Sequence, residues 1–277
     1  MRRLGWILAI SAALPLAVVA YMYSLATSDP VVRTVTVEMP DWPAGAKPLR
    51  VVLLSDIHVA GPDMPPSRLA RIVELVNGLQ PDTVLLAGDF VSDKRPATHY
   101  YASNEALGSL AKLRASKGVF AVLGNHDHWR SAAEVGEGLR RANVRLLVNE
   151  AVTVGGMRLG GVDDEFTGHA DLRATASAMR AGRGSKVLLT HSPDVVPETP
   201  GDVTLVLAGH THCGQIRLPL YGPLTSVTRY GSRFECGLIT DGPHRVVVTS
   251  GIGTSVLPLR LGAPPDIWLL TLGPEKS

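Results

Sequence analysis

The chain has 277 residues, of which 45% are hydrophobic and 19% are charged, and its formal net charge is +2. A high apolar content with a small net charge excludes a disordered chain, and two cysteines in this length exclude a small protein held together by disulfides. Two of the basic residues, Arg2 and Arg3, precede a neutral remainder, which lacks the positive charge of an electrostatic nucleic-acid binder.

An uncharged, mostly aliphatic run, Leu4–Ala26, follows these two arginines. A helix of its 23 residues, rising about 1.5 Å per residue, is roughly 34 Å long and can cross a hydrocarbon core about 30 Å thick. Because basic residues precede the run, we expect the N-terminus in the cytoplasm and the rest of the chain outside it. The small-x-small sequence at 24–26 also fits a cleavage site, so a removed signal peptide stays open as the alternative.

The long uncharged run occurs only once, which indicates a single pass through the inner (cytoplasmic) membrane followed by one water-soluble domain. We therefore expect residues 1–27 to form a signal anchor, residues 28–48 a linker with a first strand, and residues 49–277 one domain. Apolar and polar residues alternate over Arg33–Met39, which predicts the first strand.

From Leu49 onward, short apolar runs alternate with segments of helical periodicity. The apolar runs predict buried strands at Leu49–Leu54, Thr83–Ala87, Val119–Leu123 and Val144–Val148. Apolar residues three and four positions apart predict helices at Pro66–Leu79, Ala102–Arg114 and Ser131–Ala142. This alternation is typical of βαβ units and a mostly parallel sheet. Later in the chain we expect a hairpin over Val152–Val162, a helix over Leu172–Ala181, and strands at Lys186–Thr190, Val203–Ala208, Arg245–Thr249 and Ile267–Leu272.

Five polar clusters stand directly after predicted strands. They are Asp56-Ile57-His58, Gly88-Asp89, Gly124-Asn125-His126-Asp127, His191 and Gly209-His210-Thr211-His212. Each cluster alone is compatible with a turn or with a hydrogen-bonded core residue. Because the carboxyl ends of strands in an open α/β sheet face a shared crevice, their common position favours one site.

The residue types in these clusters indicate a pair of metal ions. Imidazole and carboxylate ligands suit Zn, Mn and Fe, whereas Ca and Mg sites are nearly all oxygen. Seven candidate ligands are too many for one ion that must also hold water, but they fit two ions about 3.5–4 Å apart that share a carboxylate and a hydroxide. Such a pair stabilises the attacking and leaving oxygens of a displacement at phosphorus, so the sequence predicts a phosphoesterase.

In this order the clusters resemble the calcineurin-like metallophosphoesterase superfamily. The match runs from about Leu49 to about Arg217. Beyond it, Gly251–Ser255, Leu257–Arg260 and Pro264–Asp266 resemble the C-terminal part of the membrane-associated YkuE/YaeI-like branch. The resemblance implies an α/β (α+β) fold of four layers, in which two mixed β-sheets form a sandwich flanked by helices, preceded here by one N-terminal transmembrane helix.

The resemblance also implies a role for each residue of the clusters. The implied metal ligands are Asp56, His58 and His212 for one ion, Asn125, His191 and His210 for the other, and Asp89 between the two. His126 would contact the phosphate and act as general acid toward the leaving oxygen. Asp127 would orient His126 through its ring N–H.

For function, the resemblance implies a membrane-anchored phosphodiesterase with two divalent ions (Mn, Zn or Fe). A metal-bridging hydroxide would hydrolyse phosphodiester or pyrophosphate bonds of envelope or lipid-linked substrates, with no nucleic-acid partner. One alternative is a UDP-2,3-diacylglucosamine pyrophosphatase of lipid A synthesis, although that substrate faces the cytoplasm and conflicts with the expected topology. A non-catalytic metal-binding envelope protein and a plain phosphomonoesterase are further alternatives.

Cys213 stands where the superfamily usually has glycine after Gly-His-Thr-His. Its thiol could pack in the interior, bind a metal ion, or pair with Cys236, and an exported domain permits a disulfide. The sequence alone leaves these three alternatives open.

Overall fold

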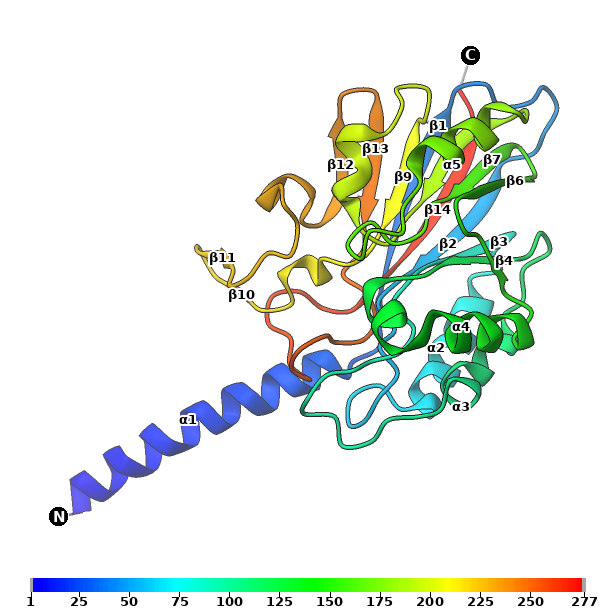
Figure 1. Ribbon diagram of the computed structural model, residues 1–277. Helices are drawn as coiled ribbons and strands as arrows, with labels where there is room; N and C mark the ends of the chain where they lie inside the picture. The colour runs from blue at the N-terminus through cyan, green and yellow to red at the C-terminus, as the bar shows by residue number, and fades with distance from the viewer. Residues whose placement is uncertain (1, 276–277) are drawn as a thin grey trace.

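Two six-stranded sheets pack face to face in the computed structural model, which describes residues 2–275 and, for side chains, residues from 13 on (Figure 1). The first sheet has the order β1 (Val31–Met39), β14 (Asp266–Pro274), β2 (Leu49–Leu54), β3 (Thr83–Ala87), β4 (Val119–Val122) and β5 (Arg145–Leu146). Its neighbours are parallel except for β14 and β2, which are antiparallel. The sheet is therefore mixed.

The second sheet has the order β12 (Gly237–Asp241), β13 (His244–Val248), β9 (Leu205–Ala208), β8 (Ser185–Leu189), β7 (Met157–Gly161) and β6 (Glu150–Val154). Its central pairs are parallel, and the pair at each edge, β12 with β13 and β6 with β7, is antiparallel. Two mixed sheets in a sandwich are the architecture that the sequence resemblance implies, so this part of the prediction is confirmed.

Three apolar clusters hold the four layers together. Between the sheets, side chains such as Leu85 of β3 and Leu207 of β9 are fully buried. The outer face of the first sheet packs against α2 (Pro66–Gly78), α3 (Ser103–Leu107), the short 3₁₀ helix Gly108–Lys112 and α4 (Asn125–Arg141). The outer face of the second sheet packs against α5 (Leu172–Arg180) and the 3₁₀ helix Pro193–Glu198.

Most predicted elements are present within one or two residues, and two helices differ. The helix expected over Ala102–Arg114 is divided into α3 and the following 3₁₀ helix. The helix expected from Ser131 begins six residues earlier at Asn125, and the non-helical backbone of Ser131 (φ 179°, ψ 101°) separates its first turns from the rest. Periodicity could not reveal those first turns, because their residues are polar and face the site instead of a core.

The first strand, expected over Arg33–Met39, is β1, which pairs along its whole length with β14 from Val31 opposite Asp266 to Met39 opposite Pro274. Arg33 Nε donates to Asp266 Oδ2 at 2.6 Å across this pair. The segment after the N-terminal run is therefore built into the first sheet.

The expected membrane span, Leu4–Ala26, coincides with helix α1 (Arg2–Ala26), and its first side chains lie outside the described residues. Within the part of the chain that the structure describes, none of the helices combines the length and the apolar character needed to cross a membrane. The structure therefore does not support the transmembrane helix of the predicted fold.

Replacing Leu207 by alanine tests the packing between the sheets. Leu207 is fully buried in the core between them, so Leu207→Ala should lower the free energy of unfolding by about 3 kcal/mol through lost burial and the cavity left behind. The matched control is Leu238→Ala on the exposed side of β12. This variant should change the free energy of unfolding by less than about 0.5 kcal/mol. Urea unfolding followed by circular dichroism measures both, and equal losses would contradict the described core.

Candidate metal centre

All seven predicted ligands lie at the carboxyl ends of five strands and are buried. Each follows its strand within four residues: Asp56 and His58 after β2, Asp89 after β3, Asn125 after β4, His191 after β8, and His210 and His212 after β9. The site therefore draws side chains from both sheets, and the packing of the sandwich brings their strand ends together.

The first group of donors surrounds His58 and His212. Their Nε2 atoms lie 3.1 Å apart, and Asp56 Oδ1 is 3.3 Å from His212 Nε2. Asp89 Oδ2 lies 3.4 Å from His58 Nε2 on the other side. Asp56, His58 and His212 are the ligands that the sequence resemblance implies for the first ion, and Asp89 is the implied shared carboxylate.

The second group surrounds His191. Its Nε2 atom lies 3.1 Å from Asn125 Oδ1, 3.1 Å from His210 Nδ1 and 3.3 Å from Asp89 Oδ2. The same oxygen of Asp89 thus faces both groups of donors. The residues that the sequence predicts for two ions are therefore brought into two adjoining clusters with one carboxylate between them.

Burial and charge set the protonation of these groups. Burial lowers the pKa of His58 and His212 well below the ordinary value and that of His210 to about 3, so these imidazoles keep a free lone pair. Burial alone would raise the pKa of Asp89, but the neighbouring His191 lowers it well below its usual range.

Burial alone would lower the pKa of His191, but the Asp89 carboxylate raises it well above its ordinary value. His191 Nδ1 is hydrogen-bonded to the carbonyl of Ala87 at 2.7 Å, which leaves Nε2 to face the site. Three neutral imidazoles, a fourth whose Nε2 proton a divalent cation can replace, and a charged carboxylate between them fit two metal ions.

The backbone at the site is strained. Five of the seven candidate ligands adopt the left-handed conformation that glycine favours: Asp56 (φ 51°), His58 (φ 49°), Asp89 (φ 56°), His210 (φ 69°) and His212 (φ 50°). Such conformations cost about 1–3 kcal/mol each and are maintained by the surrounding structure. Gly209 belongs to this arrangement, because a Cβ atom there would overlap Ser55 Oγ and the carboxylate of Asp56.

His126 is oriented by a residue that the sequence analysis did not identify. His126 Nδ1 is hydrogen-bonded to Asp93 Oδ1, and His126 Nε2 lies 4.0 Å from Asp89 Oδ2. The expectation that Asp127 orients His126 is wrong. Asp127 stands in the first turn of α4, where its fully buried carboxylate accepts backbone N–H groups of Gly124, Phe90 and Val91 at 3.0, 2.8 and 3.2 Å. It ties the ends of β3 and β4 together instead.

Arg260 is a second residue whose role the sequence did not reveal. Its buried guanidinium donates to the carbonyl oxygens of Ser250, Gly251 and Gly253 and lies 3.5 Å from His212 Nδ1. The loop it holds donates two backbone N–H groups to the segment after β2: Ile252 N–H to the carbonyl of Ser55 at 3.1 Å and Gly253 N–H to the carbonyl of Asp56 at 2.7 Å. Arg260 therefore supports the segment that carries Asp56 and His58, two donors of the first group. In the sequence, this role was indicated by the position of Arg260 in the Leu257–Arg260 motif.

Cys213 and Cys236 form a disulfide. Of the three alternatives for Cys213, the structure shows the covalent pair. The bond joins the residue after His212 to the segment before β12.

A cavity of about 460 Å³ opens onto the candidate metal donors. Its floor includes Asp89, Asn125, His126, His210 and His212. Its other walls are mostly apolar and are formed by Trp129, Phe166, Ile216, Leu224, Val227, Val256 and Leu257, with smaller polar contributions from Thr211, Gly214, Gln215, Thr225 and Ser255. A substrate in this cavity would lie between polar donors and an apolar surface.

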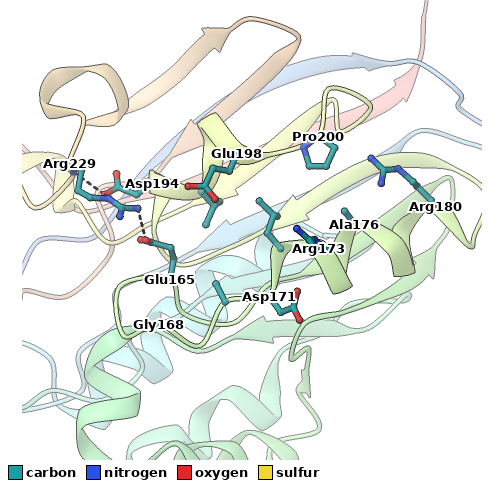
Figure 2. A pocket seen from close by; sticks show the side chains of 13 residues that line it. Glu165, Gly168, Asp171, Arg173, Ala176, Arg180, Asp194, Glu198, Pro200 and Arg229 are labelled. Carbon is teal, nitrogen blue, oxygen red and sulfur yellow. Dashed lines mark hydrogen bonds and ion pairs between the residues drawn. The ribbon is translucent and has the colours of Figure 1, made fainter.

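A larger cavity of about 620 Å³ lies beside α5 and is shown in Figure 2. Its rim carries the ion pairs of Arg229 with Glu165 and Asp194. None of the candidate metal ligands lines it. The smaller cavity is therefore the one that adjoins the candidate metal ligands.

A model of the calcineurin-like phosphoesterase family matches residues 49–214. The chain belongs to this family. The uncharacterized metallophosphoesterase YkuE of Bacillus subtilis is 30% identical over 237 residues, which cover 83% of this chain and 81% of that protein. An uncharacterized metallophosphoesterase of Helicobacter pylori is 33% identical over 238 residues, which cover 83% of this chain and 61% of that protein.

A transmembrane protein with metallophosphoesterase domain from Danio rerio is 31% identical over 282 residues, which cover 94% of this chain and 62% of that protein. The chain thus spans about three fifths of two of these relatives. The predicted resemblance to calcineurin-like phosphoesterases and their YkuE-like branch is confirmed. Together with the cluster of His and Asp donors, it supports a metal-dependent phosphoesterase.

Replacing Asp89 tests the shared carboxylate. We expect the purified chain to bind two divalent ions, and Asp89→Asn to lose most of both, because one oxygen of Asp89 faces both donor groups. Elemental analysis after dialysis measures the metal content. The control is Asp202→Asn, which weakens ion pairs with Arg180 and Lys186 that none of the candidate ligands joins and should retain the metal of the parent. Full retention of metal in Asp89→Asn would contradict a shared ligand.

Proposed function

We propose that the protein hydrolyses phosphodiester or pyrophosphate bonds with the aid of two divalent ions, Mn, Zn or Fe. The observation that carries the proposal is the position of Asp89 Oδ2 between two groups of donors, with His126 beside it at the floor of one cavity. A phosphoester placed in this cavity meets both groups at once.

The candidate ligands form two sets, one for each ion. One ion would be held by Asp56, His58 and His212, and the other ion by Asn125, His191 and His210. Asp89 would contact both ions. When bound, the two ions supply positive charge for the phosphate oxygens and lower the pKa of water. Asn125 is a neutral ligand, so it anchors a cation without adding negative charge that would repel the substrate.

His126 is placed to transfer a proton. Its Nδ1 atom is held by Asp93, so its Nε2 atom can face the leaving oxygen of a substrate in the cavity. Asp93 orients the ring, and the ring gives its Nε2 proton to the leaving oxygen. Because Asp127 is engaged with backbone N–H groups, Asp93 is the carboxylate that acts on this ring.

The apolar walls of the cavity favour a substrate with an apolar group next to the phosphoester. Trp129, Phe166 and Leu257 are examples of these walls. We propose envelope or lipid-linked phosphoesters as the substrate class, and a diacylated sugar nucleotide belongs in the panel of compounds to be tested. Anchoring in the inner membrane with the catalytic domain outside the cytoplasm stays a prediction that rests on the uncharged run Leu4–Ala26.

Hydrolysis of bis-(p-nitrophenyl) phosphate with added Mn²⁺ tests the reaction. The parent chain should cleave this diester faster than p-nitrophenyl phosphate. His126→Ala should keep its metal and lose about 100-fold or more in kcat, because the leaving oxygen no longer receives a proton. Equal kcat in His126→Ala and the parent would show that His126 does not give a proton to the leaving oxygen. A parent chain that shows no turnover with its metal bound would be a metal-binding protein of another kind. Preference for the monoester would indicate a phosphomonoesterase.

Replacing Asp93 tests how His126 is oriented. Asp93→Asn should retain metal and fold and lower kcat about 10-fold or more, because the ring of His126 loses the carboxylate that orients it. Asp127→Asn should instead lower the free energy of unfolding, because a neutral amide accepts the three backbone N–H groups less well. A kcat for Asp93→Asn equal to that of the parent would show that Asp93 does not act on the ring.

A further inference from the structure

Large apolar side chains gather on the surface around the mouth of the catalytic cavity. Trp129, Phe166, Leu224, Val256 and Leu257 are between 43% and 71% exposed, and all five line the cavity. Soluble proteins rarely expose contiguous apolar surface of this kind without a partner. The mouth is therefore the part of the surface on which a partner is most expected.

The hairpin formed by β10 (Arg217–Leu218) and β11 (Gly222–Pro223) extends this surface outward. At its tip Leu220 is fully exposed, and Tyr221 is 74% exposed. Leu224, directly after β11, donates its backbone N–H to Ile216 and lines the cavity. The hairpin and the mouth thus form one surface, which we name the apolar rim: Trp129, Phe166, Leu218, Leu220, Tyr221, Leu224, Val227, Val256 and Leu257.

The main segments of the apolar rim carry no charge. Residues 218–228 and 251–259 contain no Asp, Glu, Lys or Arg. Interfaces between proteins usually have a polar border around their apolar centre. The uncharged surface instead favours a partner that is itself apolar.

Helix α1 is fixed next to the apolar rim. Arg260 donates its backbone N–H to the carbonyl of Met22 at 3.1 Å, Tyr23 Oη donates to the carbonyl of Pro62 at 3.4 Å, and Ala26 is fully buried. Before this contact, α1 exposes apolar side chains such as Leu16. Figure 1 shows α1 and the β10–β11 hairpin projecting from the same side of the two-sheet body.

We propose that the apolar rim docks on the surface of a lipid bilayer, with the tip of the β10–β11 hairpin among the acyl chains and the catalytic cavity open toward the lipid. The cavity opens within the rim, so a second copy of the chain bound there would close the entrance. A fluid lipid surface covers the same side chains and still lets a lipid molecule diffuse into the cavity. The proposal concerns a docking surface and does not require that the bound phosphoester be hydrolysed.

A fluorescent probe at the hairpin tip tests the proposal in the full chain. Both native cysteines are in the disulfide, so Leu220→Cys provides one thiol for an environment-sensitive nitrobenzoxadiazole label. The labelled chain is reconstituted in phosphatidylethanolamine–phosphatidylglycerol vesicles with and without nitroxide-labelled acyl chains. Leu220 is fully exposed, so the label should not disturb the fold, and circular dichroism and metal content check this.

The matched control is Leu238→Cys on β12, which Figure 1 shows far from α1. Nitroxide-labelled lipids should quench the probe at 220 about twofold and leave the probe at 238 unchanged. Equal quenching at the two positions, or none at 220 while the chain floats with the vesicles, would overturn the proposal. A blue shift at 220 that increases with the protein-to-lipid ratio without quenching would overturn it in favour of a second copy. Fluorescence needs no turnover, so its result is separate from that of the hydrolysis assay.

Discussion

The candidate site depends on one buried carboxylate that faces imidazoles from both sheets. Asp89 and His58 follow strands of the first sheet, His191 follows a strand of the second, and one oxygen of Asp89 lies within 3.4 Å of a nitrogen of each imidazole. A buried charge is costly unless neighbours of opposite charge or hydrogen-bond donors offset its desolvation. The sandwich supplies these neighbours only when its two sheets pack in this alignment, so the electrostatics of the site and the packing of the apolar core depend on each other.

The backbone supports this arrangement at a cost in strain. Donors in the left-handed conformation, such as Asp56 and His212, would relax if the loops around them were free. Three supports prevent this: the carboxylate of Asp127 joins the ends of β3 and β4, the guanidinium of Arg260 holds the loop against Asp56, and the disulfide fixes the segment after His212. The donors are thus held in place by the protein before any ligand is considered, which is the usual requirement of a precise site.

The sequence predicted the parts of the molecule that follow from repeated local patterns. Buried strands appear as apolar runs, and the polar clusters stand at fixed places after them. The resemblance to calcineurin-like phosphoesterases then implied which seven residues of these clusters are ligands. The partner of His126 could not, because Asp93 and Asp127 are both acidic residues near it and only the fold decides which carboxylate reaches the ring. The start of α4 was missed for a related reason: its first turn is held by the capping interaction of Asp127 and the site itself, and it lacks the apolar spacing that reveals an amphipathic helix.

Arg260 shows how the apolar rim and the donors are connected. Its backbone N–H contacts the last turns of α1, its guanidinium holds the loop that lies against Asp56, and the same guanidinium is 3.5 Å from His212. A fully buried arginine with this many carbonyl partners leaves little freedom between the segments it joins. Arg260 therefore connects the end of α1 with the loop beside the cavity. A surface that contacts α1 thus has a fixed orientation relative to the metal donors, in contrast to a domain that is joined to its helix by a flexible linker.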